Sequence, residues 1–203
     1  MGSTAASFPL DWLERGDGRP AGDLDLAVLL VNTHDLLEDP ADRLGDLTWL
    51  TSALRRVGHA DVAGALTRSD VPRLRSLRTV LRAAFEAPDL KTAAAVLNPQ
   101  LVKARAVFLI DLPSRPRGAG ARFVATPDRT GYAALAARLP AALATHVADN
   151  GVGRLGICSS DPCRCAFVDR TRAGTRRYCC TVCNDRYAAR AYRRRRRGIG
   201  EKD

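Results

Sequence analysis

The residues best suited to chemistry are six cysteines, all of which lie between Cys158 and Cys183. Two close pairs stand out, Cys158 with Cys163 and Cys179 with Cys183. Each pair can supply two thiolates, and the loop between the pairs can bring them together, as a tetrahedral Zn²⁺ site requires. We therefore predict one structural zinc ion held by these four side chains. An iron–sulfur cluster is the rival metal, but paired cysteines before a packed basic helix favour zinc.

A strongly basic segment surrounds and follows the cysteines. Residues 154–203 hold 14 of the 32 Lys and Arg residues but only 5 of the 22 acidic residues, so they carry +9 of the net charge of +10. We expect a helix over 185–197, on which Tyr187 and Tyr192 pack against the cysteine knuckles or the neighbouring domain. Adjacent arginines bind phosphate whether or not they are helical. A metal-built platform with a basic helix suits nucleic acid. The predicted contacts come from Arg176, Arg177, Arg186, Arg190, Arg193, Arg194, Arg195, Arg196 and Arg197.

Composition excludes several classes of protein. Clustered cysteines are not the pattern of a secreted disulfide scaffold, so we predict a reducing, cytoplasmic setting. No apolar stretch reaches the roughly 18 residues that a membrane helix needs. We find no Gly-rich phosphate loop and no Gly-x-Ser-x-Gly turn, and the three histidines, His34, His59 and His146, are isolated. We therefore predict that the chain is not an enzyme.

Patterning along the chain predicts a mainly α fold of the α+β type. We expect a poorly ordered segment 1–21, a helical domain 22–152 with one β-hairpin near 102–126, and a small treble-clef or ribbon-like zinc module 153–198 that ends in the basic helix. The expected helices cover 24–37, 46–57, a short stretch near 61, a segment capped by Ser69 that ends near 85, 89–97 and 130–148.

Asn32 and Thr33 belong to the one polar group inside an otherwise apolar helix. Asn, Thr and Asp side chains compete for backbone partners, so we favour a buried hydrogen-bond cluster. The alternative is the floor of a pocket for a small-molecule effector, although a pocket usually shows several convergent polar groups.

The segment from Arg154 to Arg197 resembles the CGNR zinc finger. The marks of that family here are the Cys-x4-Cys pair, Phe167-Val168-Asp169-Arg170-Thr171-Arg172, Arg176-Arg177-Tyr178-Cys179 and Cys183-Asn184-Asp185-Arg186. The preceding part resembles ABATE, a stress-induced transcription regulator domain of bacteria, through Val31-Asn32-Thr33, Leu47-Thr48-Trp49-Leu50 and Leu97-Asn98-Pro99. Together these resemblances imply a DNA-binding transcription regulator with a sensing or interaction domain. The rival function is a module that binds RNA or an acidic protein partner.

Two departures from the family pattern matter. Asn184 and Asp185 replace the Gly-Asn of the naming tetrapeptide, and we expect Asn184 to take a left-handed turn and Asp185 to cap the basic helix. Cys180 competes with Cys179 as the partner of Cys183, and we prefer Cys179 because it directly follows the Arg-Arg-Tyr motif. Cys165 and Cys180 then remain as spare thiols. The sequence shows no clear dimerisation device, so it leaves the oligomeric state open.

Overall fold

The computed structural model describes residues 21–111, 122–125 and 128–199, so all but the last residue of the predicted disordered segment 1–21 lies outside the described residues. The helices are α1 (Asp23–Val31), α2 (Leu47–Arg56), α3 (Ala60–Gly64), α4 (Val71–Phe85), α5 (Leu90–Ala104), α6 (Gly131–Asn150) and α7 (Thr181–Ile199), with short 3₁₀ turns at Arg43–Gly45, Arg68–Asp70 and Val152–Arg154. The strands are β1 (Phe108–Asp111), β2 (Arg122–Ala125), β3 (Leu155–Ile157) and β4 (Ala166–Val168). The predicted fold class, mainly α with a small zinc-finger-type module, is confirmed.

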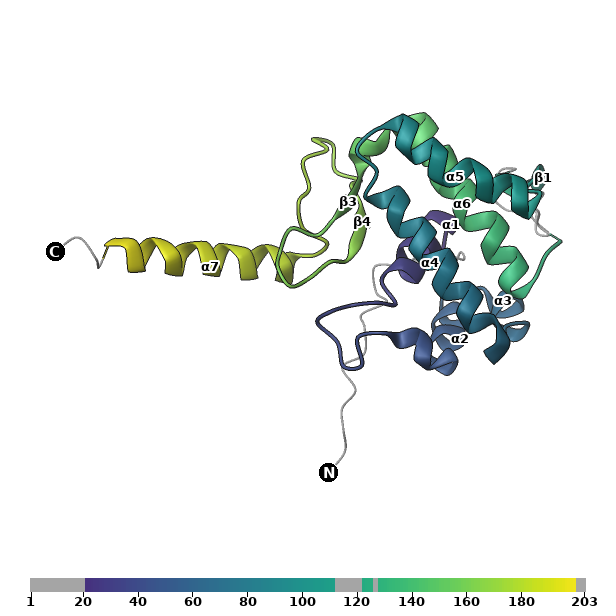
Figure 1. Cartoon of the computed structure of the whole chain (residues 1–203), viewed down its shortest axis with the longest axis horizontal. Helices are drawn as coiled ribbons and strands as arrows, with labels where there is room; N and C mark the ends of the chain where they lie inside the picture. The colour runs from purple at the N-terminus through teal and green to yellow at the C-terminus, as the bar shows by residue number, and fades with distance from the viewer. Residues whose placement is uncertain (1–20, 112–121, 126–127, 200–203) are drawn as a thin grey trace, which may run out of the picture.

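Helix α1 lies at the centre of the N-terminal part, residues 21–150. Its residues from Asp25 to Val31 are all buried, because α4, α6 and strand β4 pack around it (Figure 1). A helix that is apolar on every side has to be covered on every side. Helix α5 lies along α6, while α2 and α3 pack against each other at the far end (Figure 1). Among the described helices, none combines the length and the apolar character needed to cross a membrane.

Helix α1 ends at Val31, so the prediction that it continues to Leu37 is wrong. The Thr33 hydroxyl donates to the Leu30 carbonyl at 2.7 Å, and Leu36 and Leu37 are 48 % and 40 % exposed. Polar side chains that bond the local backbone therefore stop the helix although apolar residues continue beyond it.

Helix α5 also differs from the prediction that it ends at Leu97. It runs through Pro99 to Ala104, and the chain turns away at Arg105, where φ is 46°. Packing along α6 outweighs the local preference of proline against a helix interior. The strand that we expected from residue 102 consequently begins only at Phe108.

The described residues form two antiparallel hairpins. Strand β1 pairs with β2 in the register Phe108↔Ala125, which confirms the hairpin predicted near 102–126. Strand β3 pairs with β4 in the register Gly156↔Phe167. Helix α4 begins after a capping box of Thr67 and Asp70, whereas we expected Ser69 as the cap.

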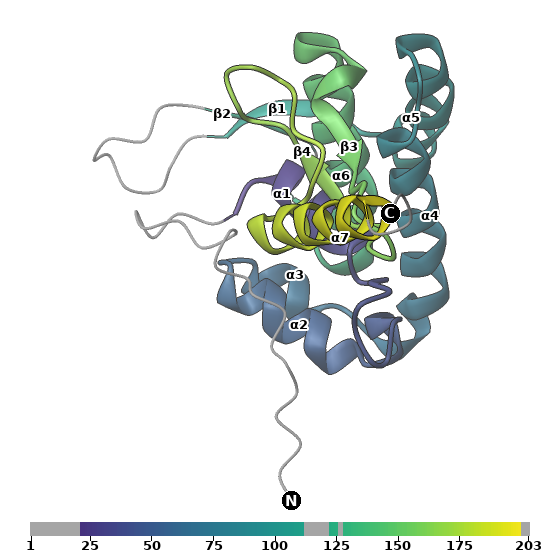
Figure 2. The ribbon, with the colours of Figure 1, turned by 90° about the vertical axis from the view of Figure 1, so that its left-hand side faces the viewer.

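The second hairpin joins the two halves of the chain. Leu155, Ala166 and Val168 are buried in the same hydrophobic cluster as α1, α4 and α6. All the cysteines except the exposed Cys180 form a smaller separate cluster beyond the hairpin, together with Tyr178. Helix α7 extends from that cluster away from the helical body, and it points toward the viewer in Figure 2 (Figures 1 and 2). The module is thus anchored at one end by the main core and free at the other.

Candidate metal centre and basic helix

The backbone positions each cysteine of the predicted metal site. Cys158 and Cys163 lie in the connection between β3 and β4, where the Cys158 N–H donates to the Cys165 carbonyl at 2.9 Å. The Cys163 N–H donates to the Ser160 carbonyl at 2.8 Å, which closes the turn of the first pair. Cys183 lies in the first turn of α7, so the start of the basic helix is part of the site.

The sulfur atoms of Cys158, Cys163, Cys179 and Cys183 all lie within 4.8 Å of one another. The Cys179 Sγ is 3.7 Å from the Cys163 Sγ and 3.6 Å from the Cys183 Sγ. A Zn–S bond of about 2.3 Å places the sulfurs of a tetrahedral site about 3.8 Å apart. The donor set and its spacing therefore fit Zn²⁺, and the cluster includes Cys179 where Cys180 was the competing candidate.

Without a compensating charge, the clustered thiols do not all ionise together. Burial raises the pKa of the Cys183 thiol, and the neighbouring Cys163 sulfur raises the pKa of Cys179. The Cys165 thiol donates to Cys163 and lowers the pKa of that sulfur. A bound Zn²⁺ would supply the positive charge that deprotonates coordinating thiols. Cys165, expected to be a spare thiol, thus contacts a candidate ligand.

Asp169 organises the loop between β4 and the second cysteine pair. Its carboxylate accepts from the Thr171 N–H at 2.8 Å, from the Thr171 hydroxyl at 2.6 Å and from the Arg176 N–H at 2.8 Å. The Thr171 hydroxyl bond is the main reason why the pKa of Asp169 lies below its usual range. The loop that presents Cys179 is therefore held by one buried carboxylate.

Arg176 supports the same loop with its side chain. The Nε of Arg176 donates to the Tyr178 carbonyl at 2.8 Å, its Nη2 donates to the Cys179 carbonyl, and its guanidinium lies 5.2 Å from the Phe167 ring centroid. The Phe167 ring lies against Gly156, where an added Cβ would meet its Cζ at 2.5 Å. The structure thus gives Arg176, a predicted nucleic-acid contact, a role in supporting the loop.

Asn32 connects helix α1 to the hairpin. Its Nδ2 donates to the Ala166 carbonyl at 3.0 Å, and its Oδ1 accepts from the Ala166 N–H at 2.7 Å. Both residues are buried, so the amide of Asn32 takes the place of a neighbouring strand at the edge of β4. Thr33 is fully buried and bonded to Leu30. The hydrogen-bond cluster is present, and although Asn32 borders a cavity of about 260 Å³, both polar ends of its amide are already bonded to Ala166.

Helix α7 begins at Thr181, earlier than expected. Asn184 is helical rather than left-handed, and Asp185 lies inside the helix, so both predictions for these residues are wrong. The cause is Cys183, which has to lie in the first turn to bring its sulfur to the other three.

The arginines of the predicted interface other than Arg176 fall into two groups. Arg186 Nη1 lies 3.9 Å from the Cys183 Sγ, and Arg190 Nη1 donates to the Asp161 carbonyl at 2.5 Å, so these two brace the start of α7. The second group is exposed and comprises Arg177, Arg193, Arg194, Arg195 and Arg196, while the side chain of Arg197 lies outside the described part of the chain.

The two tyrosines of α7 were both expected to pack against the body. Tyr187 packs against Tyr178 with ring centroids 5.3 Å apart, as expected. Tyr192 is 56 % exposed and lies on the free part of the helix, so that prediction is wrong for it. An exposed aromatic ring among arginines leaves a second type of contact available to a partner.

Two known families match the chain, and the boundary between them falls between the end of α6 and the start of β3. The family described as ABATE, "Putative stress-induced transcription regulator", matches residues 24–150, which is more than half of the chain. The chain belongs to the ABATE family. The CGNR zinc finger matches residues 154–196, which contain all four cysteines of the candidate site. No curated protein matched this ABATE member. The resemblances drawn from the sequence are confirmed, and the chain combines an ABATE domain with a CGNR zinc-finger module.

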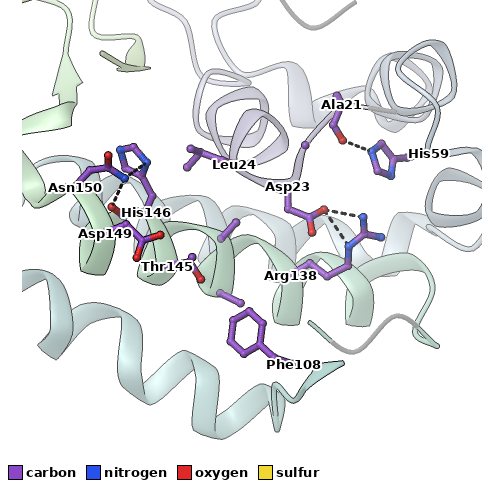
Figure 3. Close-up of a pocket in the computed structure, with 13 residues that line it drawn as sticks. Ala21, Asp23, Leu24, His59, Phe108, Arg138, Thr145, His146, Asp149 and Asn150 are labelled. Carbon is purple, nitrogen blue, oxygen red and sulfur yellow. Dashed lines mark hydrogen bonds and ion pairs between the residues drawn. The ribbon is translucent and has the colours of Figure 1, made fainter. Parts of the chain in front are cut away.

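The ABATE part carries a cavity of its own, away from Asn32 and Thr33. A space of about 400 Å³ lies between the start of α1 and one face of α6 (Figure 3). On the wall of this cavity, the Arg138 guanidinium donates two hydrogen bonds to the Asp23 carboxylate, at 2.6 and 3.0 Å. The Nε2 of His146 is buried there without a hydrogen-bond partner among the described residues. Burial, followed by the charge of Arg170, lowers the pKa of His146. The sequence signal that we missed is Arg138, an isolated charge in the Ala- and Leu-rich segment 133–144.

Proposed function

We propose that this chain is a DNA-binding transcription regulator in which four cysteines hold one Zn²⁺ ion and thereby anchor α7 against duplex DNA. The ligands are Cys158, Cys163, Cys179 and Cys183, and the N-terminal part senses a small effector or binds a partner. Membership of a regulator family and the geometry of the four sulfurs support this proposal. The activity is binding rather than catalysis, and a reducing cytoplasm would keep the thiols available to the metal.

The observation that carries the proposal is the isolation of α7. Between Asn184 and Arg196, every described side chain is exposed except those of Arg186 and Ala191, which are half-buried. A helix without a packed apolar face is marginal in water, and adjacent guanidinium groups repel one another. Phosphates would remove that repulsion, and an α-helix fits the major groove of B-DNA, which is about 12 Å wide. Helix α7 is therefore shaped and charged for duplex DNA.

The metal assignment is tested by elemental analysis of the purified chain. We expect one zinc per chain, and we expect its loss from the Cys158→Ser/Cys183→Ser double variant. Cys180→Ser is the matched control, since the Cys180 thiol is exposed and lies outside the four-sulfur cluster. Zinc content near zero in the wild type, or full zinc in the double variant, would refute the assignment.

DNA binding is tested by the salt dependence of affinity. We expect the Arg193→Gln/Arg196→Gln variant to lower the slope of log affinity against log salt by up to about 1.8, because each phosphate that is no longer neutralised lowers it by about 0.9. The control removes two equally exposed charges from α5, Lys91→Gln/Lys103→Gln, and should leave the slope unchanged. A flat salt response of the wild type would favour the acidic protein partner.

Competition by duplex RNA distinguishes DNA binding from RNA binding, which is the other alternative function. The major groove of an A-form duplex is too deep and narrow for side chains to read, so an RNA duplex of the same sequence should compete weakly. Equal competition by RNA would contradict insertion of α7 into a major groove.

The cavity between α1 and α6 is the proposed place for the effector, and a saturable thermal shift with a metabolite library would identify its ligand.

A further inference from the structure

A groove lies between the first cysteine pair and α7, and we propose that it is a phosphate-binding site. Its volume is about 600 Å³. The lining residues come from the turn of the first pair and from one side of α7: Ser159, Ser160, Asp161, Tyr187, Arg190, Arg193 and Arg194. The inference rests on the proposed function, because it assigns a defined site to one phosphate of the bound partner.

The charge of the groove favours an anion. Three guanidinium groups line it against one carboxylate, that of Asp161, whose side chain is 92 % exposed. Arg190 donates to the Asp161 carbonyl at 2.5 Å and lies 3.6 Å from its carboxylate, which fixes the guanidinium at the edge of the groove. Within the described residues, neither Arg193 nor Arg194 has a hydrogen-bond or ion-pair partner. Two cations are therefore free to pair with an incoming ligand.

Ser160 supplies an independent sign of a missing partner. The residue is 2 % exposed, and its Oγ is buried without a hydrogen-bond partner among the described residues. A buried hydroxyl without a partner loses its hydrogen bonds to water and gains none in return, so such groups in folded proteins call for an explanation. A ligand oxygen in the groove would accept from this hydroxyl.

Phosphate matches this set of donors better than other anions do. Guanidinium groups bond phosphate oxygens in pairs, and a serine hydroxyl adds a short bond to a third oxygen. The groove also continues onto the exposed arginines of α7, so a phosphodiester of a DNA strand could enter it while the helix lies in the groove of the duplex. This phosphate contact would set the position of α7 along the DNA backbone, because it involves the rigid turn of the metal site as well as flexible arginines.

The test compares matched pairs of variants of the zinc-loaded full chain. Arg194 lines the groove and Arg195 does not, although both are exposed on α7 and carry the same charge. Ser160 lines the groove, whereas Ser52 is an exposed serine on α2 and does not. We expect Arg194→Gln to weaken duplex DNA binding about tenfold and Arg195→Gln about threefold or less. We expect Ser160→Ala to weaken it three- to tenfold without changing the salt slope, and Ser52→Ala to leave it unchanged.

A second arm titrates inorganic phosphate against chloride at constant ionic strength and follows the amide NMR signals of residues 159–161. Saturable shifts that disappear in Arg194→Gln, with DNA affinity unchanged in Ser160→Ala, would assign the site to free phosphate. If the two variants of each matched pair bind DNA equally and phosphate causes no saturable amide shifts, the inference is overturned while the proposed function stands. If the wild type binds no DNA, the proposed function fails and the phosphate titration alone decides the groove. Loss of zinc from Ser160→Ala would also overturn the inference, because Ser160 would then serve the metal site.

Discussion

Replacing Asn32 by alanine should show how strongly the two parts of the chain depend on each other. Asn32 and Ala166 are 4 % and 1 % exposed, and two hydrogen bonds of 3.0 and 2.7 Å join them. The substitution removes both bonds and leaves a buried N–H and a buried carbonyl of strand β4 without partners. Each of these two unpaired groups costs about 1–3 kcal/mol, so we expect the free energy of unfolding to fall by about 2–6 kcal/mol. That is a large part of the roughly 5–15 kcal/mol that stabilises a typical domain.

The assay is urea denaturation of the zinc-loaded chain, combined with hydrogen exchange at the Ala166 amide. Asn98→Ala is the matched control, since Asn98 is exposed on α5 and its replacement should change stability by a few tenths of a kcal/mol. In Asn32→Ala, exchange at Ala166 should accelerate even under conditions where the chain stays folded. A loss of less than about 1 kcal/mol, or unchanged exchange at Ala166, would refute the view that Asn32 acts as a neighbouring strand.

Three further outcomes are expected. The Arg78 side chain holds the pKa of Asp42 at about 2, below its ordinary 3.8, so the stability that Asp42 contributes is present above about pH 4 and is lost as the pH falls toward 2. The carboxyl is 32 % exposed, and after solvent screening this contribution is about 1 kcal/mol, which Asp42→Asn should remove from the acid unfolding curve. Gly131→Ala should destabilise the chain by about 2 kcal/mol or more in thermal unfolding, because φ is +55° and a Cβ would lie 2.8 Å from a backbone oxygen, whereas Gly153→Ala meets open space and should have little effect. Removal of zinc by a chelator should abolish the hydrogen-exchange protection of residues 155–168, whereas α5 and α6 should stay protected. Loss of protection in all three segments would show that the metal stabilises the whole fold.

Local rules accounted for the parts of the fold that depend on short stretches of sequence. The apolar spacing of α6 and the aspartate that caps α2 are local features, and the observed helices follow them closely. The cysteine spacing likewise predicted a cluster of four sulfurs, and the Arg-Arg-Tyr motif favoured Cys179 over Cys180 as its third member. The strong charge asymmetry identified the basic helix from composition alone.

Contacts between distant segments decided the rest. Asn32 lies 134 residues from Ala166, so no local pattern could show that its amide completes the edge of β4. Pro99 would end an isolated helix, yet α5 continues past it because the packing along α6 is worth more than the missing hydrogen bond. The groove beside α7 exists only because Cys183 draws the helix against the turn that carries Ser160. The sequence by itself therefore determined the module, its candidate ligands and its charge, while only the tertiary structure decided which polar side chains are bonded within the fold and which remain free for a ligand.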